Sequence, residues 1–273
     1  MSSFEHHYPY KITLPKSTKV GLLLSIPHCG IEFPKDIEGI YDPSIIKHPD
    51  DTDWYLQELY DFASEMGVTI IEAVYSRWVI DLNRTPENKN LYNDGRIITS
   101  LCPSTNFFGT AIYSHPENEP SKKEIERRLK KYYIPYHDKI DSLLFELKKE
   151  FGRVILWDAH SIRRNVPTIQ KADFPDFILG NNDETTASRE VIEVALKSLQ
   201  SSHFDIQHNK PFKGGYITRS KGDPNKNIHA LQLEMSKDLY MQNKERDYDP
   251  IKASKIKKIL KQTFTQLISC LHE

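Results

Sequence analysis

The sequence predicts an α/β fold in which a mainly parallel or mixed β-sheet lies between helical layers, a three-layer α/β/α arrangement. The first observation is a pair of continuous apolar runs, 19–28 (KVGLLLSIPH) and 153–160 (RVILWDAH), which suit strands covered on both faces. The second is the alternation of such runs with helical patterns along the chain. No repeat, low-complexity tract or linker divides the 273 residues, so we expect one domain spanning 1–273.

The first helix is expected over 51–67, where apolar side chains recur at mostly helical spacing. Asp51 or Thr52 is its candidate N-cap, because short polar side chains accept hydrogen bonds from the first free backbone N–H groups. Gly67 provides the C-terminal stop.

The rest of the chain continues the alternation. Residues 68–84 are rich in β-branched and aromatic residues and are expected to be extended. Residues 85–119 carry many Pro, Asn, Gly, Ser and Thr, and a loop of that length is usually functional or mobile, as a lid is. A long amphipathic helix or helix pair is expected over 121–152, interrupted at Pro135 and ended by Gly152. The remaining expected elements are a short strand at 176–180, a helix at 186–200, a glycine-containing loop at 210–224, a strand at 229–236 and a helix at 251–271.

The charge balance argues against a nucleic acid or an anionic membrane as partner. Lys and Arg number 37 against 38 Asp and Glu, a formal charge of -1, so no general electrostatic attraction to polyanions is expected. No apolar run reaches the roughly 18 to 20 residues that span a bilayer, and the N-terminus lacks a basic segment followed by an apolar one. We therefore expect a cytoplasmic protein whose partner is a small molecule.

The cysteines do not indicate a disulfide framework. Cys29, Cys102 and Cys270 are an odd number without CxxC spacing, which also argues against a cysteine-based zinc site. Cys29 adjoins His28, but neighbours on a strand point to opposite faces and are poorly placed as nucleophile and base. The serine in residues 158–162 (DAHSI) does not stand in a GxSxG motif, the nucleophile turn of serine hydrolases. We therefore rank covalent catalysis below metal catalysis.

Both apolar runs end at a histidine, His28 in the first and His160 in the second. Ligands of open α/β sheets gather beyond the carboxyl ends of the strands, so the two imidazoles have a geometric reason to meet. Two histidines, one carboxylate and one water make the open tetrahedral zinc site of a hydrolase. For either histidine alone, a hydrogen-bonded residue at a strand end is the favoured interpretation, but together the two histidines favour a metal site.

Several acids are available to complete this site. Asp50, Asp51 and Asp53 lie within HPDDTDW, and at least one of them is expected only to cap a helix or complement its dipole. Asp158 precedes His160 by two positions, so it points to the same side of the strand and could orient that imidazole by a hydrogen bond.

The segment SRWVIDLNR places Arg77, Asp81, Asn83 and Arg84 within eight residues. Arginine offers a planar fork suited to carboxylates, and the asparagine amide can donate to a carbonyl or carboxylate oxygen. The alternative is a surface turn with a solvated arginine and an aspartate salt bridge.

Glu234 stands inside the otherwise apolar strand LQLEM, where an ionised side chain is costly unless it is paired or used. It is therefore a candidate general base whose pKa is tuned by burial and a nearby metal. Gln232, two residues earlier, points to the same face of the strand as Glu234. The alternative is therefore that this face is exposed to solvent and that Glu234 points outward.

The segment KGGYITRSKG matches no P-loop, because the order GxxxxGK[ST] is missing. Its adjacent glycines, Gly214 and Gly215, suit a tight bend or a close backbone approach. Arg219 and Lys213 are candidates for a second anionic contact.

Taken together, these segments resemble the N-formylglutamate amidohydrolase family, whose deformylases act in histidine degradation. The resemblance runs from about residue 22 to residue 240, and the segments that carry it are SIPHCG, DTDWYLQELYDFASEMG, YSRWVIDLNR, LWDAHSIRRNVP, FPDFILG, FKGGYITRSKGDP and IHALQLEM. It implies a metal-dependent amidohydrolase with a phosphorylase/hydrolase-like fold, related to the zinc carboxypeptidases and to the aspartoacylase and succinylglutamate desuccinylase group.

The resemblance also implies roles for single residues. These are metal binding by His28 and His160, contact with the oxyanion by Arg77, substrate handling by Asp81, Asn83 and Arg84, and general base catalysis by Glu234. It assigns the acidic metal ligand to Asp53. Glu32, a few residues after the first histidine, is the reserve candidate, and Asp51 stays open.

The reaction expected from the resemblance is hydrolysis of N-formyl-L-glutamate to formate and L-glutamate, with Zn2+ as the metal and Co2+, Fe2+ or Mn2+ as alternatives. In it, Asn83 and Arg84 hold one substrate carboxylate, and Arg219 or Lys213 the other. The stretches 96–121 and 180–190 diverge from the deformylases, which leaves the acyl group and the amino acid open. A hydrolase of another N-acyl amino acid, and a catalytically silent binding protein of the same fold, are the alternatives.

Overall fold

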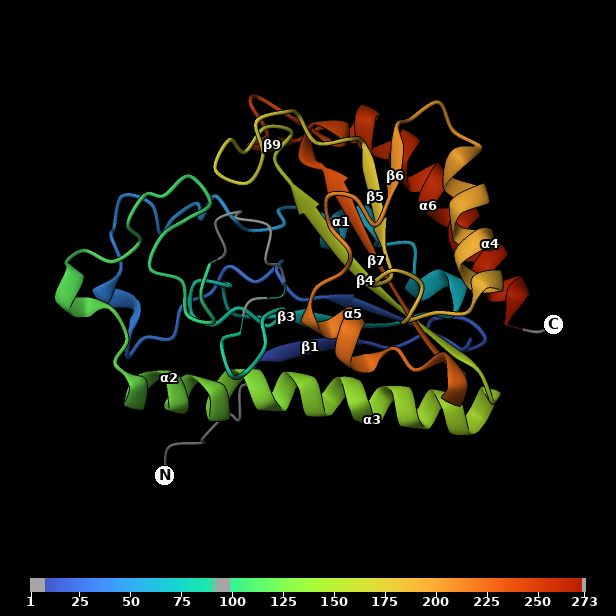
Figure 1. The fold of residues 1–273 in the computed structure, drawn as a ribbon, viewed down its shortest axis with the longest axis horizontal. Helices are drawn as coiled ribbons and strands as arrows, with labels where there is room; N and C mark the ends of the chain where they lie inside the picture. The colour runs from blue at the N-terminus through green and yellow to red at the C-terminus, as the bar shows by residue number, and fades with distance from the viewer. Residues whose placement is uncertain (1–7, 90, 92–98, 272–273) are drawn as a thin grey trace.

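A twisted β-sheet forms the centre of the protein, as the computed structural model in Figure 1 shows. The structure describes residues 8–89, 91 and 99–271. Within these residues a seven-stranded sheet has the order β1 (Tyr10–Thr13), β3 (Thr69–Ala73), β2 (Leu22–Ile26), β4 (Val154–Ile162), β7 (Ile228–Ser236), β5 (Phe177–Gly180) and β6 (Ile206–His208). Two short strands, β8 (Met241–Gln242) and β9 (Asp247–Tyr248), form a separate hairpin.

The sheet is mixed, as the sequence predicts. The four central strands β3, β2, β4 and β7 are parallel to one another. The strand β1 is antiparallel to β3, and β5 is antiparallel to β7. The expected α/β class is therefore confirmed, with antiparallel strands near both edges.

Helices cover both faces because β2 and β4 are apolar on both faces. Every residue of these two strands is buried. Leu22 and Leu24 of β2 pack into the core with α4 (Arg189–Gln200) and α6 (Pro250–Cys270), whereas Leu23 packs into the core with α3 (Ile134–Phe151). Figure 1 accordingly shows α3 on one side of the sheet and α4 and α6 on the other.

The prediction of a continuous helix over 51–67 is wrong. The segment forms only a short helix, α1 (Leu56–Leu59), and a 3₁₀ turn at Ser64–Met66, and Tyr55 before α1 is left-handed with φ 63°. The acid expected to cap the helix is used elsewhere, because the Asp51 carboxylate accepts hydrogen bonds from Trp78 Nε1 and Phe107 N, both at 3.0 Å.

The long helical segment is confirmed in outline. The helix α2 (Lys122–Arg128) passes through a π-helical turn at Leu129–Tyr133 into α3, and Pro135 is the second residue of α3, directly after that turn. Gly152 ends α3 with φ 74°. The helices α4 and α6 and the strands β4, β5 and β7 lie close to the expected positions.

Other elements differ from expectation. The expected extended segment 68–84 is a strand only in β3, and a turn begins at Arg77. The expected loop at 210–224 contains a helix, α5 (Tyr216–Lys221). Of the expected 85–119 loop, residues 90 and 92–98 lie outside the described residues. In the described part of the chain, no helix is both long and apolar enough to cross a membrane.

Candidate metal centre and active site

The pairing of β2 with β4 brings the two histidines together. Ser25 of β2 lies opposite Asp158 of β4, so His28, two residues beyond β2, reaches the level of His160 near the end of β4. The centroids of the two imidazole rings are 4.8 Å apart. The sheet thus produces the convergence that the sequence predicts, although His160 lies inside its strand and not after it.

Asp53 is the acid that joins the histidines. Its carboxylate Oδ2 lies 3.1 Å from His160 Nδ1 and 3.7 Å from His28 Nδ1, and its backbone N–H donates to the His28 carbonyl at 2.9 Å. One ligand atom from each of the three residues lies within 4.8 Å of the others, and each residue is at most 3% exposed. This cluster could hold a metal ion. Asp51 is engaged by Trp78 and Phe107, and Glu32 is exposed and pairs through its backbone with Tyr75.

The outer ring nitrogens of both histidines face carboxylates. His28 Nε2 donates to Asp81 Oδ1 at 2.8 Å, and His160 Nε2 lies 3.3 Å from Asp158 Oδ2 and 2.9 Å from the Asn83 amide nitrogen. Metal-binding histidines commonly use the second nitrogen in this way, which fixes the ring and raises its basicity. The donor set and its supporting carboxylates therefore fit a divalent cation such as zinc.

Opposite electrostatic environments act on the two imidazoles. Burial and the Arg77 guanidinium lower the pKa of His28 to about 4, so this ring is neutral and ready to bind a cation. Burial also opposes charge on His160, but Asp158 and Asp53 outweigh it and raise the pKa of that imidazole well above its usual value. Burial raises the pKa of Asp53 while the hydrogen bond from His160 lowers it, with a net decrease.

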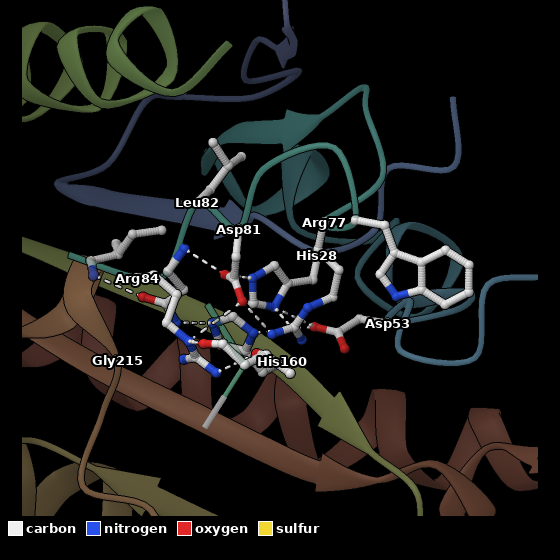
Figure 2. Close-up of polar contacts among 12 residues, drawn as sticks. His28, Asp53, Arg77, Asp81, Leu82, Arg84, His160 and Gly215 are labelled. Carbon is white, nitrogen blue, oxygen red and sulfur yellow. Dashed lines mark hydrogen bonds and ion pairs between the residues drawn. The ribbon is translucent and has the colours of Figure 1, made fainter. Parts of the chain in front are cut away.

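Arg77 and Asp81 form a buried ion pair beside His28 (Figure 2). Arg77 Nη2 donates to Asp81 Oδ2 at 2.5 Å, and Nη1 lies 3.2 Å from His28 Nδ1. Burial raises the pKa of Asp81, but the positive charges of Arg77 and Arg84 and the hydrogen bond from His28 outweigh it and hold the pKa well below the usual range. The ring of Phe107 covers the Arg77 guanidinium, with 4.7 Å from Cζ to the ring centroid. A fixed positive charge therefore stands at the edge of the histidine cluster.

Glu234 faces the same cluster from the neighbouring strand. The register of β4 and β7 sets Glu234 opposite His160, so both side chains are on one face of the sheet, and Glu234 lines the pocket. Gln232 accepts from Gly215 N at 2.7 Å, and its amide donates to Glu234 Oε2 at 3.3 Å. Burial raises the pKa of Glu234 to about 7.

Asn83 connects the histidine cluster to the start of α5. Its side-chain oxygen accepts from Ile217 N at 2.8 Å while its amide nitrogen contacts His160. A Cβ at Gly215 would lie 2.2 Å from the Asn83 amide nitrogen, so only glycine allows this approach. Arg84, which also lines the pocket, donates to the carbonyl and hydroxyl oxygens of Thr99, both at 3.0 Å.

The other two basic candidates lie outside the pocket lining. Arg219 donates to the carbonyl oxygens of Gly214 at 2.8 Å and Leu91 at 3.2 Å. The Lys213 ammonium pairs with Asp183 at 2.6 Å on the surface. The structure thus places Asn83 and Arg84 in the pocket lining, whereas Arg219 is one contact away from it, at the lining residue Leu91.

Sequence reasoning missed two features of this region. Lys237 directly follows β7 and is 3% exposed, with its ammonium donating to the Asp50 carbonyl at 3.1 Å, and burial lowers its pKa. Its only sequence signal is its place at the end of an apolar strand. The pocket also has apolar lining residues, namely Leu91, Phe107, Ile162, Ile169 and Phe212. Phe107 gives no signal because it lies in an irregular loop.

The α/β fold and this pocket define a hydrolase-like centre that could hold a metal ion. The chain matches the family model described as N-formylglutamate amidohydrolase over residues 20–241. It is 36% identical to the N-formylglutamate deformylase of Pseudomonas putida over 255 residues, which cover 92% of this chain and 93% of the relative. It is 39% identical to the N-formylglutamate deformylase of Pseudomonas aeruginosa over 229 residues, covering 83% and 84%.

Solved structures support the same grouping at the level of the fold. The crystal structure of N-formylglutamate amidohydrolase from Ralstonia eutropha matches with a TM-score of 0.80 at 23% identity and covers 96% of both chains. A protein from Agrobacterium tumefaciens matches with a TM-score of 0.73 at 18% identity, covering 98% and 97%. The chain belongs to the N-formylglutamate amidohydrolase family, which confirms the resemblance found in its sequence.

Proposed function

We propose that this protein hydrolyses N-formyl-L-glutamate to formate and L-glutamate, with a divalent metal ion, preferably zinc, at His28, Asp53 and His160. The observation that carries the proposal is the convergence of these three buried ligand atoms within 4.8 Å, with Glu234 in register on the next strand. The relatives named N-formylglutamate deformylase, which align with 83% and 92% of the chain, support the substrate. In this role the protein performs the last step of a histidine degradation pathway.

The bound cation would polarise the formyl oxygen and lower the pKa of a water molecule toward about 7. Two imidazoles and one carboxylate suit zinc, and cobalt, iron and manganese are the alternatives. His28 presents a neutral ring to the ion. At His160 a proton and a metal ion compete for Nδ1, so binding would release a proton.

Glu234 is the proposed general base. It takes a proton from the attacking water as the new C–O bond forms, and it returns the proton to the nitrogen as the C–N bond breaks. A pKa of about 7 suits both steps near neutral pH. Gln232 holds one carboxylate oxygen of Glu234, which restricts its orientation.

Arg77 provides the positive charge for the oxygen that becomes negative in the tetrahedral intermediate. Its guanidinium is buried, so a fixed charge there is worth more than in water. Asp81 orients both Arg77 and His28. Asn83 and Arg84, which both line the pocket, bind a substrate carboxylate through an amide donor and a guanidinium.

The test is a metal analysis of protein purified without chelator or added metal, paired with formate release from N-formyl-L-glutamate before and after chelation. We expect about one metal ion per chain and formate release that chelation abolishes and metal restores. An alanine variant of His160 should lose both. Bound metal without formate release would overturn the substrate, and activity in metal-free protein would overturn the ligand set.

A further inference from the structure

The pocket has two chemically different ends. One end carries Asn83, Arg84, Gly215 and Gln232, which offer amide and guanidinium groups. The other end carries four side chains that we call the apolar wall, namely Phe107, Ile162, Ile169 and Phe212. N-formyl-L-glutamate has two carboxylates and a formyl group with a single hydrogen, so its acyl end alone covers little of this wall.

The contacts around the centre separate the two ends. Three successive contacts lead from the polar end to the apolar wall. Arg84 Nε lies 3.8 Å from Asp81 Oδ2, Asp81 forms an ion pair with Arg77, and the Arg77 guanidinium packs on the Phe107 ring. Figure 2 shows Arg84 on one side of His28 and Asp53 on the other. The loop with Phe107 is held on the Asp53 side, because Phe107 N donates to Asp51.

The sheet shows the same polarity. Along β7, Gln232 precedes Glu234 on the same face, and along β4, Ile162 follows His160 on the same face. The polar end of the pocket therefore lies toward the N-terminal ends of these parallel strands. The apolar wall begins two residues after His160, toward their C-terminal ends.

Packing against a small hydrophobic core holds the apolar wall in place. Ile162 belongs to a small core with Phe174 and Ile178, and Ile169 and Phe212 pack against this core. Phe212 stacks on Phe174 with ring centroids 5.3 Å apart.

Phe107 is fixed from two sides. Its N–H donates to Asp51, and its carbonyl accepts from the Thr168 hydroxyl. An apolar surface held in place in this way favours a ligand with alkyl groups, since covering it removes apolar area from water.

We propose that the apolar wall is an acyl subsite and that the enzyme also hydrolyses N-acyl-L-glutamates with short straight alkyl groups, such as acetyl, propionyl and butyryl. This inference rests on the proposed function, because that function places a substrate carboxylate at Asn83 and Arg84 and so turns the acyl group toward the wall. The reaction is the same: water adds to the acyl carbon, the C–N bond breaks, a proton moves to nitrogen, and a short-chain carboxylate and L-glutamate leave.

The first experiment measures kcat/KM of the metal-loaded enzyme for N-formyl-, N-acetyl-, N-propionyl- and N-butyryl-L-glutamate. The three alkyl substrates have similar intrinsic reactivity, so their comparison reports the subsite. We expect kcat/KM to hold constant or to rise along this series, by up to about fourfold per methylene. A fall at each added methylene, or turnover of the formyl substrate alone, would overturn the acyl subsite and leave the proposed function standing.

The second experiment tests the wall itself with Ile169→Asn, a substitution of similar size that makes one partly exposed wall residue polar. We expect the ratio of kcat/KM for the butyryl over the acetyl substrate to fall at least fivefold. Ile251→Asn, on the surface at the start of α6, is the matched control. An unchanged ratio in Ile169→Asn would overturn the assignment of the wall.

A third comparison separates this proposal from the proposed function. Failure to hydrolyse N-formyl-L-glutamate while N-propionyl-L-glutamate is hydrolysed would overturn the formyl substrate and support the subsite. Faster hydrolysis of N-formyl-L-leucine than of N-formyl-L-glutamate, which carry the same acyl group, would assign the wall to the amino-acid side chain and overturn the acyl subsite.

Discussion

The two halves of the candidate site are held in place by different means. His160 and Glu234 lie on β4 and β7, which pair without interruption from Val154 opposite Ile228 to Ile162 opposite Ser236. His28 and Arg77 lie in turns, and side chains position them. The strand half is therefore fixed by backbone hydrogen bonds that substitution leaves intact, whereas the turn half depends on a few side-chain contacts.

Asp81 is the centre of the turn half. Its carboxylate accepts from His28 Nε2 at 2.8 Å, from Arg77 Nη2 at 2.5 Å and from Asn83 N at 2.9 Å. In the strand half, Asp158 has a comparable position, but His160 has Asn83 and Asp53 as further partners. The loss of one carboxylate should thus affect the two halves unequally.

The largest effect is expected from removing the reactive group of the strand half. Glu234→Gln keeps the size and the strand register but cannot take a proton, so kcat should fall by roughly 10²-fold or more while metal content and KM stay close to wild type. Turnover rates with N-formyl-L-glutamate and metal analysis measure this. Turnover close to wild type would remove Glu234 as the base.

The comparison of the two halves is tested most directly by Asp81→Asn against Asp158→Asn. Asp81→Asn weakens three contacts at once, so we expect metal affinity to fall by about 10- to 100-fold, the range found for supporting groups around metal ligands. Asp158→Asn should cause a smaller loss, because the strand and Asn83 still hold His160. Competition with a chelator gives the metal Kd of both variants. A larger loss of metal affinity in Asp158→Asn than in Asp81→Asn would contradict the expected difference between the two halves.

The same division explains what the sequence could predict. Buried strands with polar exceptions are visible as a pattern, so His160 and Glu234 could each be placed on a strand of an α/β sheet, whereas the pairing of these two strands comes from the structure. The turn half gives no periodic signal. In particular, the sequence could not show that Asp81 holds Arg77 and His28, or that Asp51 binds Trp78 and Phe107 and so leaves the expected helix at 51–67 without its cap.

The apolar wall escaped prediction for a related reason. Phe107, Ile169 and Phe212 come from three irregular segments, and only tertiary packing brings them together. The same irregularity affects Arg219 and Lys213, where only tertiary structure shows that Arg219 contacts the lining residue Leu91 and that Lys213 pairs with Asp183.

The pH dependence of stability offers a test of the strand half without substrate. Burial raises the pKa of Glu234 from 4.5 to about 7, so the folded protein binds more protons than the unfolded chain between these pH values. Folding stability due to Glu234 therefore decreases as pH rises through this window. Because the side chain is partly exposed, we expect about 2 kcal/mol, less than the full shift implies. Urea unfolding of chelated wild type and Glu234→Gln at pH 5 and pH 8 should show the variant gaining this amount relative to wild type, and an equal difference at both pH values would contradict the buried carboxylate.

The smallest effect is expected at the polar end of the pocket. Arg84→Ala removes a guanidinium that lines the pocket but lies outside the histidine cluster, so KM for N-formyl-L-glutamate should rise by about tenfold with little change in kcat. KM for an N-formyl amino acid with an uncharged side chain should change far less, because that substrate lacks the second carboxylate.

Arg189→Ala is the control for a lost positive charge, since the Arg189 side chain is 85% exposed on α4 and pairs with Glu193. Equal increases in KM for both substrates in Arg84→Ala would reject a contact with the side-chain carboxylate of glutamate. They would assign Arg84 instead to the α-carboxylate that both substrates share, or to its hydrogen bonds with Thr99, which hold the segment after the turn half in place. The ratio of the two KM values therefore decides whether the turn half ends at Asn83 or extends to substrate binding by Arg84.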